Sequence, residues 1–170
     1  LTEIIDKKEA TLVLFSSYWQ MEKVADLLRK KKWRIKVQGE TSRQYIIDQH
    51  KKLVDTKKGS LIFGTQSFSE GLDLPGEYLT HVIITKLPFS VPTSPVEEAQ
   101  SEYVVAKGGN PFLTITVPDA AKKLVQSCGR LLRSENDKGK ISILDRRLVT
   151  KQYGKSLLDS LPPYRRQIDY

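Results

Sequence analysis

The chain alternates short, continuous apolar runs with segments whose apolar residues recur every three or four positions. The first pattern is typical of strands buried on both faces of a parallel sheet, and the second of amphipathic helices. Strands of the first kind are predicted at Thr11–Phe15, Ser60–Phe63, Leu79–Leu87 and Lys140–Leu144. Trp33–Val37 alternates apolar and basic residues and is predicted to be a half-exposed strand. Helices are predicted at Tyr18–Lys32, Ser42–Val54, Val96–Lys107 and Tyr153–Leu161. This alternation favours an α/β fold, a mostly parallel sheet with helices on both faces.

A further helix, which Pro118 can start, is predicted to carry the stretch 126–133, QSCGRLLR. If the whole stretch is helical, Gln126, Gly129, Arg130 and Arg133 share one face, and the apolar residues around them lie on the other. Two guanidiniums on one face form a fork suited to phosphate oxygens, because each is planar and always charged. Taken alone, so short a motif is more often a surface helix with solvated arginines.

A second polar stretch, residues 64–75, directly follows the strand predicted at Ser60–Phe63 and reads GTQSFSEGLDLP. Gly64 and Gly71 allow close backbone approaches that other residues do not. The stretch also carries four neutral donors: Thr65, Gln66, Ser67 and Ser69. Such a loop can hold a phosphate backbone, and the carboxylates of Glu70 and Asp73 can accept from a ribose hydroxyl or order a water. An ordinary polar loop is an equally good interpretation of this stretch alone.

Composition narrows the choice of partner and compartment. The formal charge of +8, from 28 basic and 20 acidic residues, favours a polyanionic partner. No apolar run is long enough to span a bilayer. The single cysteine, Cys128, excludes an internal disulfide and a cysteine-ligated metal site within this chain. We therefore expect a cytoplasmic protein without a metal centre in this chain. The chain begins at Leu1, so a piece of a longer or processed protein is expected. The sequence Gly154-Lys155-Ser156 lacks the earlier glycine of a Walker A motif, because position 149 is valine.

Together these stretches resemble the superfamily 2 helicases. Residues 126–133 resemble their motif VI, QxxGRxxR; residues 64–76 resemble motif V; and LFSSY, within residues 12–18, resembles motif IV. The order of these motifs, with PFSVPTSP and GGNPF in a proline-framed excursion over 88–117, is most similar to the second helicase domain of the bacterial DinG type, which is related to XPD. The resemblance implies one RecA-like domain over residues 1–170, with the P-loop NTPase fold but without the P-loop.

The resemblance also implies roles for particular residues. Arg133 corresponds to the arginine finger that reaches the γ-phosphate, with Arg130, Gln126 and Glu70 as its catalytic companions. The residues that correspond to nucleotide-binding positions are Gly71, Asp73 and Gly129. Those in regions that contact single-stranded DNA are Ser16, Ser17, Tyr18, Thr65, Gln66 and Ser67. Many relatives carry a tryptophan before the motif V glutamate, where this chain has Ser69.

The function so implied is that of the C-terminal domain of an ATP-dependent DNA helicase moving 5′ to 3′. Its partners would be single-stranded DNA and the amino-terminal helicase domain of the same polypeptide, and no membrane. ATP with Mg²⁺ would be bound mainly by that other half, which can also carry an iron–sulfur cluster, so the isolated fragment is expected to be inactive. Two alternatives remain: a non-catalytic nucleic-acid-binding module with a helicase-like fold, and half of an RNA helicase.

Overall fold

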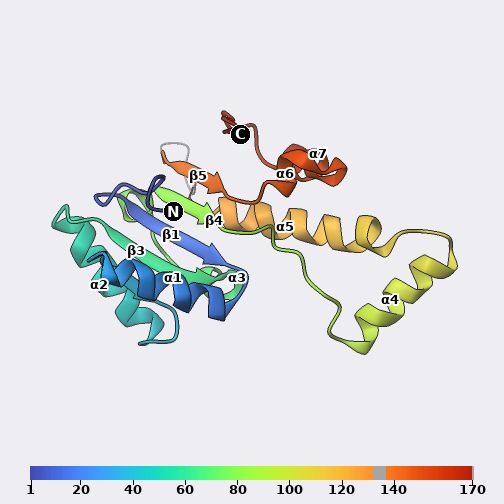
Figure 1. Ribbon diagram of the computed structural model, residues 1–170, viewed down its shortest axis with the longest axis horizontal. Helices are drawn as coiled ribbons and strands as arrows, with labels where there is room; N and C mark the ends of the chain where they lie inside the picture. The colour runs from blue at the N-terminus through green and yellow to red at the C-terminus, as the bar shows by residue number, and fades with distance from the viewer. Residues whose placement is uncertain (132–136, 170) are drawn as a thin grey trace. The chain divides into compact units, whose positions relative to one another are not determined.

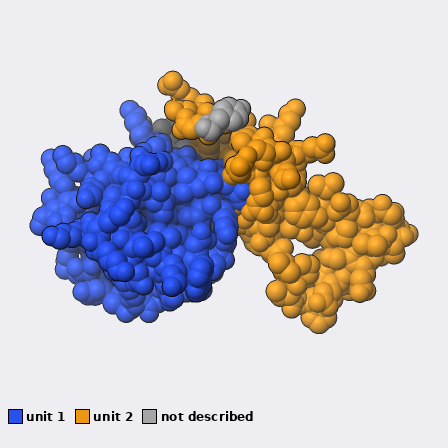
Figure 2. Space-filling view, viewed as in Figure 1, with its two compact units in different colours: residues 1–86, 127–145 blue, residues 87–126, 146–170 orange. Residues whose placement is uncertain are grey.

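The computed structural model describes residues 1–131 and 137–169 of the chain. They fall into two compact units (Figure 2). The first unit holds residues 1–86 and 127–145, and the second holds residues 87–126 and 146–170. The proline-framed excursion predicted over 88–117 therefore belongs to the second unit, whereas the segments that follow the first three strands all belong to the first.

The first unit is built on a five-stranded sheet (Figure 1). Its strands are β1 (Ala10–Phe15), β2 (Ile35–Val37), β3 (Ser60–Thr65), β4 (His81–Ile84) and β5 (Lys140–Ile143). They lie in the order β2-β3-β1-β4-β5, and every neighbouring pair is parallel. The predicted parallel sheet is confirmed, with β2 and β4 shorter than their apolar patterns suggested.

Two helices that begin at serine caps connect the first three strands. Helix α1 (Tyr18–Lys30) begins after Ser17, whose hydroxyl accepts from the backbone N–H of Gln20 at 3.4 Å. Helix α2 (Arg43–Asp55) begins after Ser42, which accepts from the N–H of Tyr45 at 3.2 Å. Each hydroxyl satisfies a donor that the helix itself leaves unpaired, which fixes where the helix starts.

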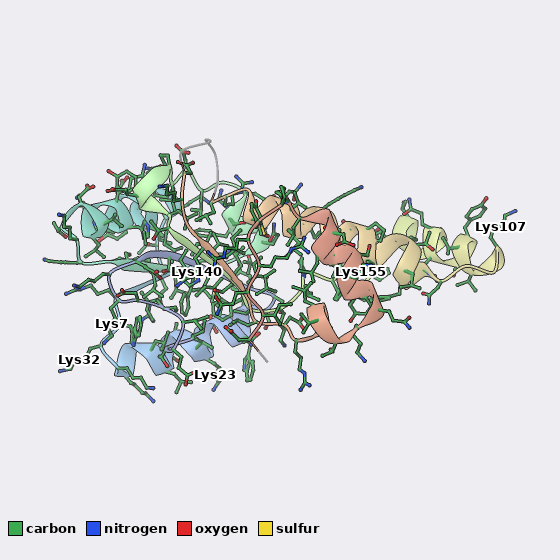
Figure 3. The ribbon with its side chains drawn as sticks, turned by 90° about the horizontal axis from the view of Figure 1, so that it is seen from above. Lys7, Lys23, Lys32, Lys107, Lys140 and Lys155 are labelled. Carbon is green, nitrogen blue, oxygen red and sulfur yellow. The ribbon has the colours of Figure 1, made fainter. Side chains whose placement is uncertain are left out.

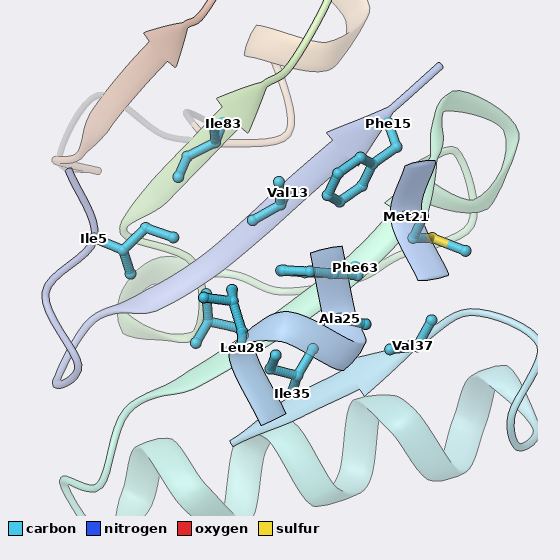
Figure 4. Close-up of a cluster of buried hydrophobic side chains, with 11 residues drawn as sticks. Ile5, Val13, Phe15, Met21, Ala25, Leu28, Ile35, Val37, Phe63 and Ile83 are labelled. Atoms are coloured by element: carbon cyan, nitrogen blue, oxygen red, sulfur yellow. The ribbon is translucent and has the colours of Figure 1, made fainter. Parts of the chain in front are cut away.

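The core of the first unit follows from the period-two alternation of the strands. Val13, Phe15 and Phe63 lie on the sheet face covered by Met21, Ala25 and Leu28 of α1, and the two phenylalanine rings are 5.0 Å apart (Figure 4). The alternate residues Leu12, Ile62 and Val82 are buried as well, on the opposite face. Helix α1 crosses from β1 to β2, and α2 crosses back from β2 to β3 in the opposite direction along the sheet. Because right-handed crossovers in opposite directions cover opposite faces, α2 lies on that second face.

The second unit is helical. Its elements are α4 (Pro95–Ala106), a π-helical turn η2 (Phe112–Thr116), α5 (Val117–Cys128), α6 (Arg147–Thr150) and α7 (Gln152–Ser160); the last two residues of α5 belong to the first unit. A capping box starts α4: Ser94 Oγ accepts from the N–H of Glu97 at 3.3 Å, and the Glu97 carboxylate accepts from the N–H of Ser94 at 3.1 Å.

Pro118 does not start the helix that it was predicted to start. The chain is already helical through η2, so Pro118 lies inside a longer helical run. Proline has no N–H to donate and its ring crowds the carbonyl four residues earlier. The wider π-helical turn immediately before Pro118 accommodates both effects.

Three aromatic rings join the separate segments of the second unit. Phe89, Phe112 and Tyr153 contact one another with centroid distances of 5.2 to 5.5 Å, and the guanidinium of Arg147 lies 5.3 Å from the Phe89 ring. Pairs of this kind stabilise packing beyond the area that they bury. Gly154, which lies in α7, packs directly against the backbone of α6, as expected for a helix surface rather than a phosphate loop. Within the described residues, no helix has both the length and the apolar character needed to cross a membrane.

Two buried histidines have structural roles in the first unit. His50 donates from Nε2 to the carbonyl of Tyr78 at 2.7 Å, and His81 lies between Glu9 at 3.0 Å and Ser142 at 2.9 Å. Both side chains are fully buried. Burial lowers the pKa of His50 and of His81, because the charged imidazolium loses its hydration.

The free energy of unfolding should therefore fall as the pH falls from about 7 to about 5. The unfolded histidines protonate near their ordinary pKa of about 6.5, whereas the folded ones stay neutral to lower pH, so the unfolded state binds more protons. The slope should be at most about 1.4 kcal/mol per pH unit for each histidine. Denaturant titrations across this range should give a flatter profile for His50→Gln; a variant profile as steep as that of the parent would contradict this account.

Candidate functional site

The carboxyl edge of the sheet brings together segments that are far apart in the sequence. Strand β1 ends at Phe15, which lies opposite Thr65 at the end of β3, and Val37 at the end of β2 lies opposite Phe63. The segments that follow these strands, 16–18, 38 and 66–69, therefore emerge at one edge. In parallel α/β sheets this edge is where ligands bind.

Gln38 connects several of the predicted side chains at this edge. Its Oε1 accepts from both the backbone N–H of Thr65 at 2.8 Å and the Thr65 hydroxyl at 3.0 Å, and its Nε2 donates to the hydroxyl of Tyr18. Thr65 Oγ1 lies 3.1 Å from Ser67 Oγ. Tyr18, Thr65 and Ser67 are thus brought together, through a glutamine that sequence reasoning did not select. The position of Gln38 directly after the strand predicted at Trp33–Val37 was the signal in the sequence that could have identified it.

The other residues predicted at motif IV and motif V have different surroundings. Ser17 uses its hydroxyl to cap α1, whereas Ser16 is exposed. Tyr18 is 52% exposed and available for stacking, whereas Phe68 of motif V is buried and is not. Residues 66–69, expected to be part of a loop, form the short helix α3 (Gln66–Ser69).

A buried hydrogen bond joins α3 to the beginning of motif VI. The hydroxyl of Ser127 donates to Gln66 Oε1 at 2.6 Å, and Ser127 is only 1% exposed. The hydroxyl of Ser69 donates to the Gln66 carbonyl at 2.7 Å. Ser69, where the family resemblance implied a tryptophan, is therefore buried with its polar group satisfied. Gln66 contributes its side chain to this connection.

The prediction that all of 126–133 forms one helix is wrong for its described part. Helix α5 ends at Cys128, and the N–H groups of Arg130 and Leu131 bond to the carbonyls of Ser127 and Cys128, three residues back. The last turn thus tightens at Gly129, a residue with low helix propensity. Gln126 is exposed near the end of α5, in the second unit, while Gly129 and Arg130 follow the helix in the first. Arg133 lies outside the described residues.

Arg130 retains a guanidinium available for an anion. Its side chain is half-buried, and it forms no ion pair with any residue in 1–131 or 137–169. Cys128, two residues before it, offers no nucleophile, because burial raises the pKa of its thiol to about 12. The chemistry available at this turn is therefore recognition of negative charge.

The two glycines of motif V have different roles. Gly64 lies in β3, where an added Cβ would stand 2.5 Å from Cδ1 of Phe68, so its small size lets that ring pack against the strand. An added Cβ at Gly71 would overlap the guanidinium of Arg43, which also lies 5.2 Å from the Phe68 ring. Arg43, at the start of α2, was not selected from the sequence; it brings a positive charge beside motif V.

The two predicted acids of motif V, Glu70 and Asp73, are both exposed, and the leucines at 72 and 74 that alternate with them are buried. This alternation anchors the segment while its polar side chains remain in solvent. Among the described residues, no group of three histidine, cysteine, aspartate or glutamate side chains could hold a metal ion.

Comparisons with known proteins identify a family and relatives for this chain. A family model described as the helicase C-terminal domain matches residues 1–164. The ATP-dependent DNA helicase DinG of Photobacterium profundum is 58% identical over 174 residues, covering 100% of this chain and 25% of that protein. The DinG helicase of Escherichia coli (strain K12) is 39% identical over 153 residues, covering 90% and 21%. The chain thus spans about a quarter of the length of these relatives.

Solved structures share the fold. The structure titled XPD_APO has a TM-score of 0.67 and 22% identity, covering 90% of this chain and 31% of that one. The S. tokodaii Xpd4 structure has a TM-score of 0.64 and 19% identity, covering 93% and 30%. At these identities the likeness concerns the fold alone, and it confirms the predicted α/β architecture.

Replacing Gln38 with alanine should lower the free energy of unfolding by about 1–2 kcal/mol, because the two Thr65 donors lose their acceptor. The control is Gln44→Ala, which removes an exposed side chain that donates to Asp48 and should change stability by less than about 0.5 kcal/mol. Urea titration of both variants measures the difference. Equal effects of the two substitutions would show that the Gln38 network contributes nothing.

Gly64→Ala should destabilise the protein by about 1–3 kcal/mol, because the Phe68 ring is buried and cannot move away from the new methyl group. Gly71→Ala is the matched control: the new group meets only the end of the flexible Arg43 side chain, which can swing into solvent. The same titration compares them. A loss at Gly71 as large as that at Gly64 would refute the packing explanation.

Proposed function

We propose that this chain, which belongs to the family of helicase C-terminal domains, is the second motor half of an ATP-dependent DNA helicase. In this role it completes an ATP cleft that another helicase domain of the same polypeptide begins, and it carries part of a single-stranded DNA track. The observation that carries the proposal is the buried Ser127–Gln66 bond, which ties the arginine-bearing turn to the segment proposed to contact DNA.

The nucleotide side of the proposal rests on charge. Phosphoryl transfer needs positioning and charge stabilisation more than covalent chemistry from the protein. Arg130, half-buried and without an ion pair to any described residue, suits a triphosphate oxygen, and Arg133 is the proposed finger. Gln126 and Gly129 would line the same cleft. Glu70, with Gly71 and Asp73, would meet the ribose or the attacking water.

The DNA side of the proposal rests on the carboxyl edge. The exposed Ser16 hydroxyl, the Tyr18 ring and the Thr65–Ser67 pair offer hydroxyl donors and one stacking surface, and none reads a base edge by itself. Ser17 holds the first of these segments by capping α1, and Gln66 holds the other through Ser127. Contacts of this kind favour the sugar–phosphate backbone, so binding should show little sequence preference and strong salt dependence.

Hydrolysis and movement are coupled in this proposal by domain closure. A finger arginine supplied by one domain completes a site on the other only when the cleft shuts. When each domain grips the strand, a cycle of closing and opening moves the pair along it, and 5′ to 3′ is the direction predicted from the family resemblance. Because Gln66 and Ser127 are bonded, the DNA-side segment moves together with the arginine turn in the first unit.

Cofactors of the full-length protein would be held elsewhere. Mg²⁺ would accompany ATP through ligands of the other helicase domain. An iron–sulfur cluster is usually held by four thiolates, whereas this chain offers only Cys128, which is buried and protonated. Any cluster would therefore take its ligands outside residues 1–170.

Arg133→Ala in the full-length protein should reduce DNA-stimulated ATP hydrolysis by about 10³-fold or more, because the transition-state charge loses its finger. Arg133→Lys should stay strongly impaired, since a point charge does not replace a planar fork. Binding of single-stranded DNA without nucleotide should stay near the parental affinity in both variants. Steady-state ATPase assays and fluorescence anisotropy measure these quantities.

The exposed Arg165, changed to alanine, is the matched control for loss of one arginine and should leave hydrolysis unchanged. Near-parental ATPase in Arg133→Ala would favour a non-catalytic nucleic-acid-binding module instead. Competition between DNA and RNA single strands in the binding assay tests the substrate class, since preference for RNA would point to half of an RNA helicase.

A further inference from the structure

The opposite edge of the sheet, at the amino ends of its strands, carries a cluster of cations. The connections that lead into β1, β2 and β3 all reach this edge, because parallel strands begin on the same side. The amino-edge cluster consists of Lys7, Lys8, Lys30, Lys31, Lys32, Arg34, Lys57 and Lys58, and all eight side chains are exposed. Figure 3 shows Lys7 and Lys32 together at this end of the first unit.

Backbone contacts hold the three connections side by side. The N–H of Ser60 bonds to the Glu9 carbonyl at 3.1 Å, and the N–H of Leu61 bonds to the Arg34 carbonyl at 3.2 Å. Nη1 of Arg34 donates to the Lys58 carbonyl at 3.3 Å. Gly59 lies so close to the backbone of residues 7–8 that no larger residue would fit. The cations are thus displayed on one ordered surface.

Acidic neighbours do not neutralise this surface. Three carboxylates lie in or beside the connections, and within the described part of the chain none of the eight cations forms an ion pair. Glu9 is engaged by His81 and Lys140, Asp6 accepts from the backbone N–H of Lys8, and Asp55 accepts from the Tyr78 hydroxyl. Eight positive charges therefore face solvent with few counter-charges.

Two of these lysines occupy positions where lysine is unfavourable. Lys32 and Lys57 have φ values of 60° and 55°, the left-handed region that favours glycine. Each follows a helix in the same hydrogen-bonded pattern: the N–H of Trp33 bonds to the Leu28 carbonyl, and that of Lys58 to the Leu53 carbonyl. Glycine is the usual residue at such helix ends. A strained lysine after each of the two helices, α1 and α2, indicates that the positive charge at these positions has a use.

We propose that the amino-edge cluster binds the phosphate backbone of a nucleic-acid duplex. Lysines act as flexible point charges, which suits contacts to phosphates rather than to base edges. A duplex carries one negative charge per about 1.7 Å of its axis, so three neighbouring connections can meet several phosphates at once. A lipid surface fits less well, because the nearest aromatic residue, Trp33, is half-buried beneath Lys7 rather than exposed.

This surface is separate from the proposed single-stranded track. The six-residue strand β1 spans roughly 20 Å between the two edges of the sheet. The cluster would therefore hold a duplex segment of the same nucleic acid while the carboxyl edge contacts the single strand. The duplex contact does not depend on the arginine finger, so the two proposals can fail independently.

The test uses the full-length protein with Lys32→Gly, Lys57→Gly, Lys8→Gln and Lys58→Gln combined. Affinity for a blunt DNA duplex of about 24 base pairs should fall at least tenfold at low salt, and the slope of log affinity against log salt should shrink by about 2–4. The two glycines should raise the thermal unfolding midpoint, because they relieve the left-handed strain. ATPase stimulated by a short single-stranded oligonucleotide should stay within about twofold of the parent.

The control combines Lys23→Gln, Lys52→Gln, Lys107→Gln and Lys155→Gln, which removes the same charge from exposed positions outside the cluster. Its duplex affinity should stay well above that of the cluster variant. Equal losses in the two variants would mean that only net charge matters and would overturn the proposal. Parental duplex binding by the cluster variant, with loss of binding to an acidic peptide instead, would also overturn it. If the fourfold variant folds poorly, the double variant Lys8→Gln with Lys58→Gln is used for the same measurement of duplex affinity.

Discussion

The parallel pairing of β1 with β3 is the constraint on which both surfaces of the first unit depend. It runs in register from Ala10 opposite Ser60 to Phe15 opposite Thr65. A shift of one residue between these strands would invert the faces of one of them and turn either Phe15 or Phe63 away from α1, so packing against α1 fixes the register. With the register fixed, the segments after the strands gather at one edge and the connections before them gather at the other.

Local pattern predicted the elements of the first unit because its strands are buried on both faces. A continuous apolar run such as Thr11–Phe15, set between amphipathic helices, is typical of such a strand, and the alternation required parallel crossovers. The candidate site was predictable only in part. Gln38 reaches Thr65 because β2 pairs with β3, and Arg43 reaches Gly71 across the fold. Such contacts depend on strand order and long-range packing, which a local pattern does not contain.

The end of α5 illustrates how periodicity can mislead. The spacing of the apolar residues predicted a helix through Arg133, of which the part to Leu131 lies within the described residues. Gly129 was the competing signal: it weakens the helix where the bonding pattern tightens to three residues. Arg130 therefore lies on a short turn after α5 rather than on the helix face, but its positive charge is unchanged. The turn begins at Ser127, which is buried and hydrogen-bonded to Gln66.

In the proposed function, the Ser127–Gln66 bond would hold the arginine-bearing turn in place. An arginine that acts on a nucleotide must be held rigidly, since misplacement removes much of its effect. Ser127 is buried, and breaking its hydrogen bond to Gln66 would cost a buried hydroxyl an acceptor, which makes separation of the two segments unfavourable. The turn and α3 therefore behave as one body within the first unit. In the proposed function, a DNA strand bound at Thr65 and Ser67 would be linked to Arg130 through α3 and the Ser127–Gln66 hydrogen bond.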